Sequence, residues 1–285
     1  MDLSIVIPAH NESATLQVIL PELKHLYDSA EILVVNDGSD DDTVAICNKN
    51  GVRVISHAYR KGNGASVKTG AREAKGEVII FMDADGQHHP ADIEALLAKM
   101  NAGFDMVVGA RDIKSHAGVP RMVGNIIYNK LASWMTGHGI LDLTSGFRAV
   151  NAARFREFLH ILPNGFSYPT TITMTFFRSG YSVAYIPIRT GSRKGKSHIR
   201  LFKDGLRFFL IIFRVTALYS PLKLFFPLSA LFFVTGAGYY LYTYFTEERF
   251  TNMSALLLTT SILIFLIGLL AEQITFLIYL NSNKN

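Results

Sequence analysis

Short apolar runs alternate with longer amphipathic stretches from the N-terminus to about residue 109. The apolar runs are rich in β-branched residues and predict buried strands over 3–7, 31–36, 52–57, 78–82 and 105–109. The apolar positions between them have helical spacing and predict helices over 13–27, from about 42, over 63–74 and over 90–102. This alternation indicates an α/β domain with a doubly wound parallel sheet.

The pattern changes in the last third of the chain. Two long apolar segments, 222–244 and 254–280, each exceed the roughly 20 residues that cross a bilayer core. Tyrosines gather near their ends, as in an aromatic belt, and Lys or Arg flank the pair on its outer sides. The positive-inside rule then predicts two spans with both termini in the cytosol. Two buried core helices are the alternative, which is less favoured because a soluble domain rarely has two such segments in succession.

A basic stretch joins the two patterns. The formal net charge is only +5, and its surplus is concentrated over 189–223. Basic and apolar residues mix over 199–217, which predicts an amphipathic helix in the headgroup region, with an ordinary linker helix as the alternative. A basic block before an apolar segment favours an anionic membrane surface or a phosphorylated ligand over nucleic acid.

These features divide the chain into three parts. We expect an α/β domain over 1–198, interfacial helices over 199–220 and a transmembrane hairpin over 221–282. The single cysteine, Cys47, excludes an intrachain disulfide. The N-terminus lacks the basic and apolar regions of a signal peptide. We therefore expect an integral protein of the cytoplasmic or endoplasmic-reticulum membrane with its α/β domain in the cytosol.

Two carboxylates, Asp83 and Asp85, follow the predicted strand over 78–82, with Ala84 between them and Gln87 two residues on. In open α/β sheets, ligands bind at the carboxyl ends of the strands. Carboxylates with an amide oxygen suit a hard divalent cation, and Mg²⁺ in turn favours phosphate oxygens. The alternative is an acidic, solvated turn.

Polar residues of the same kind follow the other strands. Glu12 follows the first strand and Asp37 the second, and carboxylates can accept hydrogen bonds from ribose hydroxyls and base N–H groups. Lys61 and Gly62 follow the third strand; lysine can offset phosphate charge, and glycine lets the backbone approach a ligand closely. Their shared edge favours a nucleotide-diphosphate site over unrelated turns.

The segments SIVIPAHNE, VVNDGSDDDT, RKGNGASVKTG and DADGQHHP, with TSGFRA downstream, resemble the inverting family 2 glycosyltransferases with a GT-A nucleotide-sugar-binding fold. More narrowly, the chain is similar to the dolichyl- and polyprenyl-phosphate hexose (mannose or glucose) synthases, over about residues 3–197, and its two spans fit the membrane-anchored members. The resemblance implies a nucleotide set of Pro8, Glu12, Asp37 and Asp85, and a set of Asp83, Asp85 and Gln87 around Mg²⁺ or Mn²⁺.

The second half of the chain offers groups for a lipid phosphate. An arginine fork matches phosphate oxygens, so Arg111, Arg148 and Arg193 are candidates for that cradle, with Ser145 as an added donor. Arg148 could instead pair with Asp142 and hold its loop. The residues expected to contact nucleotide, metal or phosphate are Pro8, Glu12, Asp37, Asp40, Lys61, Gly62, Asp83, Ala84, Asp85, Gln87, Arg111, Asp142, Ser145, Arg148, Arg193, Lys196 and Ser197.

The expected reaction moves a sugar from a GDP- or UDP-sugar to a polyprenyl phosphate. The metal would stabilise the departing nucleotide diphosphate. The acceptor is already ionised at pH 7 and needs positioning more than deprotonation, so Asp142 is either a base or an orienting group. A single in-line displacement would invert the anomeric centre. A homo-oligomer is compatible with this prediction, and the sequence leaves the oligomeric state open.

Other functions compete with this hypothesis. One is transfer of a modified sugar, such as an aminoarabinose, to the same lipid. A non-catalytic membrane scaffold on a transferase fold is another, against which the intact set of acidic residues argues. Among the remaining polar residues, His88 is expected in a solvated loop rather than at the metal. Trp134, in an amphipathic stretch, is expected beside the acceptor site or the membrane. Glu272 serves function, snorkels to the interface or pairs the two spans.

Overall fold

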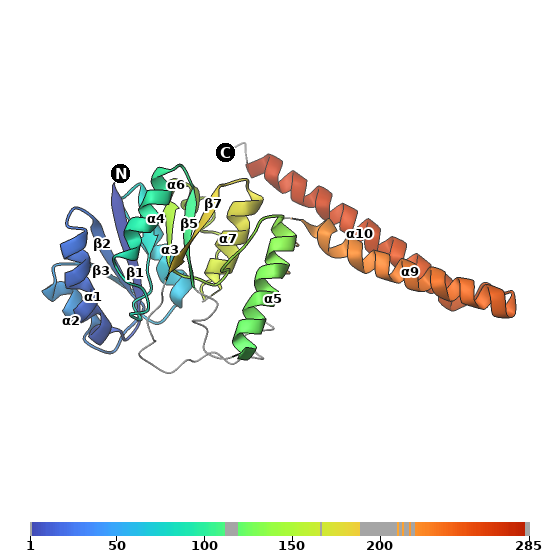
Figure 1. The fold of residues 1–285 in the computed structure, drawn as a ribbon, viewed down its shortest axis with the longest axis horizontal. Coiled ribbons are helices and arrows are strands. Elements are labelled where there is room, and N and C mark those ends of the chain that lie inside the picture. Colours follow the sequence, from blue (N-terminus) through green and yellow to red (C-terminus); the bar gives the residue numbers. More distant parts are fainter. Residues whose placement is uncertain are drawn as a thin grey trace. The chain divides into compact units, whose positions relative to one another are not determined.

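The computed structural model describes residues 2–111, 119–165, 167–188 and 220–282, together with residues 210, 213 and 217. The chain divides into two compact units, Met1–Ile211 and Ile212–Asn285. The first holds the sheet and the candidate site, and the second is a helical hairpin (Figure 1).

A seven-stranded sheet forms the centre of the first unit, in the order β3-β2-β1-β4-β6-β5-β7. Its strands are β1 (Leu3–Ala9), β2 (Glu31–Asn36), β3 (Arg53–Ser56), β4 (Val78–Phe81), β5 (Met106–Arg111), β6 (Arg148–Asn151) and β7 (Val183–Ile188). The first four strands run parallel, whereas β6 is antiparallel to both β4 and β5. The sheet is therefore mixed.

Helices cover both faces of the sheet because successive strand residues point to opposite sides. Ile5 and Ile7 of β1 belong to one apolar core, and Val6 between them belongs to the other. The first core includes residues of α1 and α4, and the second includes residues of α3, α6 and α7. The helices are α1 (Ser13–Leu26), α2 (Thr43–Lys49), α3 (Asn63–Glu73), α4 (Asp92–Asn101), α5 (Val119–Thr136), α6 (Ala152–Arg156) and α7 (Tyr168–Arg178).

The predicted α/β class and the five N-terminal strands are confirmed, but the prediction of an all-parallel sheet is wrong. The expected loop over 142–149 ends at Arg148, which starts β6 and pairs with Phe81 of β4. A strand of four residues that opens on an arginine gives no strong apolar signal. The reversal matters for the site, because β6 starts at the sheet edge where β4 and β5 end, and this brings the loop before β6 beside the turn after β4.

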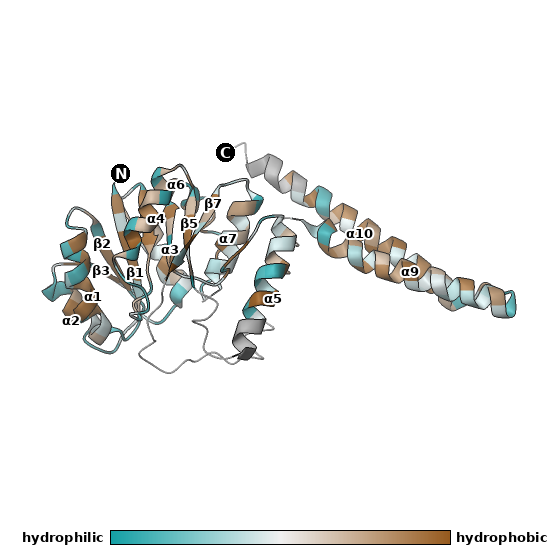
Figure 2. Ribbon diagram, in the orientation of Figure 1, coloured by the Kyte–Doolittle hydropathy of each residue, from teal (hydrophilic) through white to brown (hydrophobic). Residues whose placement is uncertain are grey.

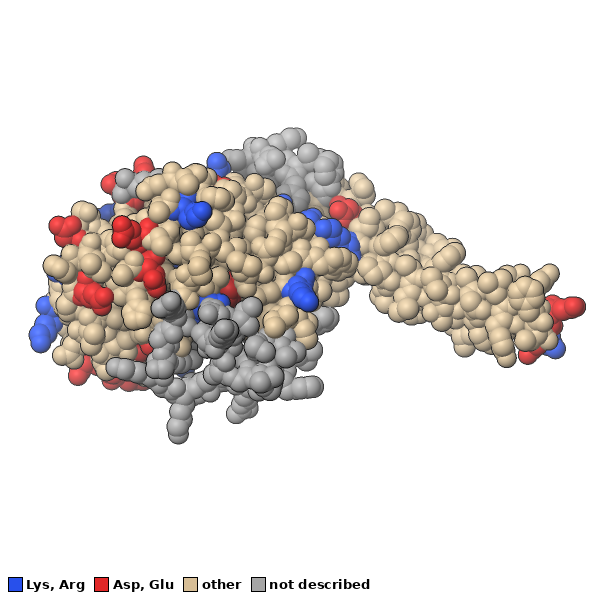
Figure 3. Space-filling model, viewed as in Figure 1, with Lys and Arg blue, Asp and Glu red and all other residues tan. Residues whose placement is uncertain are grey.

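The second unit consists of α9 (Pro221–Glu247) and α10 (Asn252–Ser282), which pack against each other. Both are long and apolar enough to cross a membrane, and only 11% and 17% of their most apolar windows are buried. Core helices of a soluble domain would be mostly buried, so the two predicted spans are supported. Brown, apolar residues cover much of the hairpin (Figure 2), and little charge shows along its visible surface (Figure 3).

Polar contacts pair the two helices of the hairpin. Ser229 and Ser261 each donate a hydroxyl to the other's carbonyl over 3.0 Å. The Glu272 carboxylate accepts the backbone N–H of Leu222 over 3.1 Å at the start of α9. A helix start leaves such N–H groups without intrahelical partners. Among the roles expected for Glu272, this contact supports pairing of the spans.

Candidate active site

The turn after β4 carries the two carboxylates expected to bind a metal. Asp83 and Asp85 are half-buried, whereas Ala84 packs into the core. The Asn63 side-chain amide, at the start of α3, donates to Asp83 Oδ1 over 3.2 Å. The Gln87 backbone N–H donates to Asp85 Oδ1 over 3.1 Å, which closes the turn. Both carboxylates thus lie on a turn that is held in shape at the sheet edge.

The donors on this turn fit a cation shared with a substrate. Asp83, Asp85 and Gln87 offer two carboxylates and one amide, and the part of the chain that the structure describes has no group of three or more His, Cys, Asp or Glu side chains able to hold a metal. Mg²⁺ is commonly bound through one or two carboxylates plus substrate phosphates. The set is therefore suited to a metal–diphosphate complex rather than to a closed structural site.

The loop over 142–147 lies directly against this turn. A Cβ atom on Gly146 would lie 2.5 Å from Asp83 Oδ2, so a side chain there would displace the Asp83 carboxylate. The buried Tyr168 of α7 donates its hydroxyl to the Gly146 carbonyl over 3.3 Å. Burial raises the pKa of Tyr168, which keeps this donor protonated at neutral pH. Neither Tyr168 nor Asn63 is among the site residues predicted from the sequence, because their contacts depend on chain segments distant in sequence.

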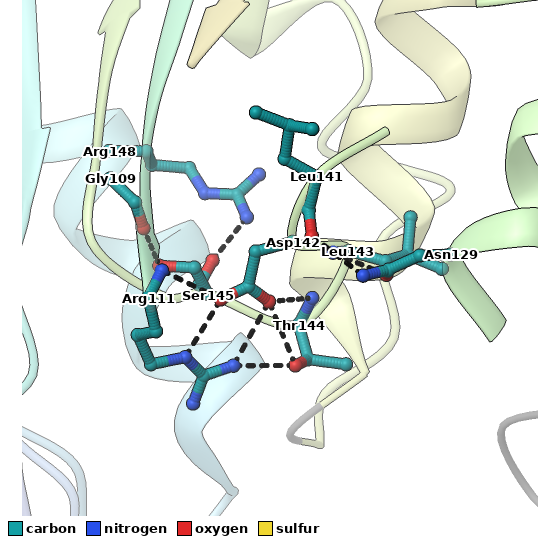
Figure 4. Close-up of polar contacts among 9 residues, drawn as sticks. All are labelled: Gly109, Arg111, Asn129, Leu141, Asp142, Leu143, Thr144, Ser145 and Arg148. Carbon is teal, nitrogen blue, oxygen red and sulfur yellow. Dashed lines mark hydrogen bonds and ion pairs between the residues drawn. The ribbon is translucent and has the colours of Figure 1, made fainter. Parts of the chain in front are cut away.

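Arg111 and Asp142 form a two-pronged ion pair (Figure 4). Arg111 Nε lies 2.8 Å from Asp142 Oδ2 and Nη2 lies 3.0 Å from Oδ1, while Nη2 also donates to the Thr144 hydroxyl over 2.6 Å. Burial would raise the pKa of Asp142, but the hydrogen bonds and charge of Arg111 outweigh it and hold that pKa below its ordinary value. Such a carboxylate is a weak base, so the geometry supports the orienting role that the sequence left open.

Arg148 lies in the core and its side chain has no exposed surface. Its guanidinium donates to the Ser145 carbonyl and, over 3.1 Å, to the Thr173 hydroxyl. The Ser145 hydroxyl donates inward to the Gly109 carbonyl over 2.7 Å. Direct contact of Arg148 or Ser145 with a lipid phosphate, as expected from the sequence, does not agree with this burial. No ion pair between Arg148 and Asp142 occurs among the described contacts either; both residues instead shape the loop before β6.

Asp37, after β2, organises the turn that precedes α3. Its carboxylate accepts the backbone N–H groups of Lys61 and Gly62 over 2.8 and 2.7 Å and faces His57 Nδ1 at 2.8 Å. Burial would raise the pKa of Asp37, but these hydrogen bonds outweigh burial and hold the pKa below its ordinary value. His57 Nε2 in turn lies 2.9 Å from the Thr69 hydroxyl. Asp37 therefore holds the turn before α3 in shape, and the sequence analysis did not identify His57, which ends a predicted strand, as its partner.

The glycine of the turn before α3 serves packing within the protein. Gly62 has φ near 104°, and a Cβ there would lie 2.5 Å from the Asn164 carbonyl oxygen. That same carbonyl accepts the Ala65 N–H over 3.1 Å. The Gly62 backbone thus approaches residues 164 and 165 closely, and no local pattern predicts this partner.

The other nucleotide-set residues lie around the same edge. Pro8 belongs to the buried part of β1, and Glu12 accepts the Thr15 hydroxyl over 3.3 Å. The backbone N–H of Asp40 donates to the Asn11 side chain over 2.9 Å, which joins the turns after β1 and β2. The Lys61 ammonium lies 5.7 Å from the centre of the exposed Tyr59 ring. These positions are compatible with the expected nucleotide pocket.

His88 differs from its expected solvated position. It is 6% exposed, and its ring stacks on Phe147 with centroids 4.8 Å apart. Burial lowers the pKa of His88, which favours the neutral ring. This stack is a second contact, after Gly146, between the turn over 83–88 and the loop before β6. Arg193, Lys196, Ser197 and most of the expected helix over 199–220 lie outside the described residues.

Comparison with known proteins identifies the two units separately. A family model described as glycosyl transferase family 2 matches residues 4–159, and one described as GtrB C-terminal hairpin matches residues 220–277. A dolichyl-phosphate hexose transferase of Haloferax volcanii is 30% identical over 210 residues, which cover 72% of this chain and 89% of that protein. An undecaprenyl-phosphate 4-deoxy-4-formamido-L-arabinose transferase of Pseudomonas savastanoi is 32% identical over 189 residues, which cover 59% and 55%.

A solved structure confirms the GT-A-like fold. The crystal structure of glucosyl-3-phosphoglycerate synthase from Mycobacterium tuberculosis, in complex with Mn²⁺, uridine diphosphate and phosphoglyceric acid, matches with a TM-score of 0.62. The match covers 75% of this chain and 78% of that one at 22% identity. At that identity the likeness concerns the fold alone.

Proposed function

We propose, from the premise that this chain belongs to glycosyl transferase family 2, that it transfers a hexose from a nucleotide sugar to a polyprenyl phosphate at a membrane surface. Mannose and glucose are the favoured hexoses. The observation that carries the proposal is the contact of Asp83 with Gly146, which joins the turn of Asp83 and Asp85 to the loop whose Asp142 pairs with Arg111. The apolar hairpin of the same chain supplies the membrane anchor.

On the donor side, Asp83, Asp85 and Gln87 would hold Mg²⁺ or Mn²⁺, and the diphosphate of a GDP- or UDP-sugar would bind beside them. When bound, this cation supplies Lewis-acid stabilisation to the departing nucleotide diphosphate. Pro8, Glu12 and the turn held by Asp37 contact the nucleoside. Since the Asp37 carboxylate already binds the backbone at Lys61 and Gly62, its main task is to fix the shape of that pocket.

On the acceptor side, Arg111 orients the lipid phosphate. Its side chain is 24% exposed, and Asp142 and Thr144 hold its guanidinium in one direction. A phosphate oxygen of the acceptor attacks C1 of the sugar, the bond from C1 to the diphosphate oxygen breaks, and the nucleoside diphosphate leaves with that electron pair. The configuration at C1 inverts. The ionised phosphate gives up no proton, so Asp142 orients Arg111 and need not act as a base.

The hairpin of α9 and α10 anchors the enzyme, with both termini and the catalytic unit on the cytosolic side. Lys and Arg flank the pair on its outer sides, and Glu247 and Glu248 lie at its turn, which supports this orientation. Cysteine labelling of the turn between α9 and α10 from each side of a sealed membrane tests it. Labelling from the cytosolic side contradicts the proposed topology.

The experiment that tests the function uses the full chain in lipid nanodiscs with Mn²⁺ and an undecaprenyl or dolichyl phosphate. GDP-mannose, UDP-glucose and a UDP-linked 4-amino-4-deoxy-arabinose derivative are supplied in turn, and the lipid product is detected by mass spectrometry. We expect one hexosyl lipid. Transfer of the arabinose derivative alone would favour the second candidate, which the formamido-arabinose transferase likeness supports.

The control is Asp85→Ala in the same nanodiscs. We expect this variant to remain in the membrane and to make no product. Product formation at the normal rate by Asp85→Ala would contradict metal-assisted transfer. Absence of any product from the unaltered chain with every donor would favour a non-catalytic scaffold.

A further inference from the structure

The outer face of α5 exposes large apolar side chains. Ile127 is 58% exposed and Trp134 is 53% exposed, and they lie seven residues apart on one face of the helix. Lys130 is exposed between them, and Leu141, in the loop that follows, is 64% exposed. We call Ile127, Lys130, Trp134 and Leu141 the α5 stripe.

The opposite face of α5 is packed on the first unit. Ala132 and Met135 are buried there, and the ring of His138 stacks on Phe177 of α7 with centroids 4.9 Å apart. Figure 1 shows α5 beside α7. The helix therefore has a conventional buried face, and the α5 stripe is a second apolar face on the opposite side.

The Lys, Arg, Asp and Glu residues of this region are all of one sign, and that sign is positive. From Val119 to Leu141 the chain has Arg121 and Lys130 but neither Asp nor Glu. A helix with exposed tryptophan and aliphatic side chains, and with basic residues only, matches the boundary between anionic headgroups and acyl chains. A soluble protein partner would not require the absence of acidic residues.

The α5 stripe is connected to the candidate site by hydrogen bonds (Figure 4). The Asn129 side chain donates to the Leu141 carbonyl over 2.6 Å and accepts the Leu143 N–H over 3.1 Å. These contacts bracket Asp142, the partner of Arg111. A surface that holds α5 therefore also holds the loop that orients Arg111.

We infer that the α5 stripe docks onto the bilayer, with Trp134 and Ile127 at the boundary between headgroups and acyl chains and Lys130 at lipid phosphates. This inference rests on the proposed membrane anchoring by α9 and α10. Docking sets the height of the Asp142 loop above the acyl chains, at the level where a membrane-borne phosphate lies. The α5 stripe is thus a second membrane contact, distinct from the spans, and it positions the acceptor side of the site.

Trp134 is the only tryptophan of the chain, so intrinsic fluorescence reports on the α5 stripe alone. The full chain is placed, one copy per disc, in nanodiscs of phosphatidylglycerol that carry bromine at different acyl positions. We expect bromine near the headgroup to quench most of the Trp134 emission, and deeper bromine to quench less. Quenching in phosphatidylcholine discs should be weaker, because the charge attraction of Lys130 is lost.

The matched control moves the tryptophan to another exposed apolar position. Val18 on α1 is 68% exposed, and Val18→Trp combined with Trp134→Phe should give emission that brominated lipid leaves unchanged. If brominated lipid does not quench the Trp134 emission but aqueous acrylamide does, the docking is overturned. Quenching that needs added polyprenyl phosphate would assign the stripe to the acceptor chain, and quenching lost in single-copy discs would assign it to a second copy; either result also overturns docking.

Kinetic measurements distinguish docking of the α5 stripe from the proposed sugar transfer. Ile127→Ser should raise the KM for a long-chain acceptor in nanodiscs several-fold, with kcat and the KM for the nucleotide sugar unchanged. Normal catalysis without lipid quenching would reject docking and leave the proposed function intact. Failure of the full chain to enter nanodiscs would reject the anchoring and the docking together.

Discussion

The turn over 83–87 and the loop over 142–148 lie side by side at one sheet edge, yet they use polar residues differently. Asp83 and Asp85 on the turn are half-buried at the edge of the sheet. In the loop, Asp142, Ser145 and Arg148 are at most 4% exposed, and their described contacts are with the protein itself. Polar residues of one sheet edge thus fall into two classes, those left partly open to solvent and those buried to hold the loop in shape.

The largest expected effect contrasts two carboxylates, Asp85 and Asp37. Asp85→Ala should lower kcat/KM for transfer by about 10³-fold or more, since it removes a ligand of the proposed metal cation. The same variant should barely change the melting temperature. Asp37→Ala leaves the N–H groups of Lys61 and Gly62 without their acceptor and should destabilise the fold by about 2 kcal/mol. Activity assays and thermal unfolding of both variants check this. Equal melting temperatures would erase the distinction between the two carboxylates.

The two arginines provide the second contrast. Arg148→Ala opens a cavity in the core and removes the donor to the Ser145 carbonyl, so we expect a loss of about 3–5 kcal/mol in the free energy of unfolding. Arg111→Ala should lower activity about 10²-fold with a smaller loss of stability, because its side chain is partly exposed. Unfolding in denaturant and acceptor kinetics measure the two effects. A stable but inactive Arg148→Ala variant would indicate that Arg148 contacts the acceptor phosphate.

How far the sequence predicts this site depends on the class of residue. Asp83 and Asp85 lie where the sequence places them, on a half-buried turn at the end of an apolar strand, because position after a strand is a local property. Arg148 and Ser145 carry groups that can bind phosphate, but Arg148, which starts the antiparallel β6, and Ser145, in the loop before it, are both buried, and no local pattern marked that strand. Burial is decided by which segments meet in space, so it is not encoded in a motif of a few residues.

The same limit explains the missed partners. His57 and Tyr168 act on residues 20 and 22 positions away, at Asp37 and Gly146. The long apolar segments of α9 and α10 are the opposite case: their length and composition alone predicted them, because crossing a bilayer imposes a requirement on every residue of the segment.

Gly146 is the point where the loop before β6 contacts the turn of Asp83 and Asp85. A single added methyl group there should disturb this contact. Gly146→Ala places a methyl group against Asp83 Oδ2 and should displace that carboxylate, lowering kcat/KM about 10–100-fold. The matched control is Gly124→Ala in α5, where an added Cβ has no neighbour within 4 Å and should stabilise the helix by up to about 1 kcal/mol. Steady-state kinetics at several Mn²⁺ concentrations are the measurement. Activity of Gly146→Ala equal to that of Gly124→Ala would show that the loop does not position Asp83.

The smallest expected effect concerns the pH dependence of the loop. Because the pKa of Asp142 is lowered in the folded protein, its ion pair stabilises the fold above the unfolded pKa of about 3.9 and loses this contribution as the pH falls through the folded value. Asp142→Asn should therefore cost about 2 kcal/mol at pH 7, and the difference from the unaltered chain should shrink as the pH falls below about 4. Unfolding of the full chain in detergent from pH 7 to pH 3 measures this difference, with the exposed Asp28→Asn as the control. A difference that stays constant down to pH 3 would mean that shape, and not the charge of Asp142, holds Arg111 in place.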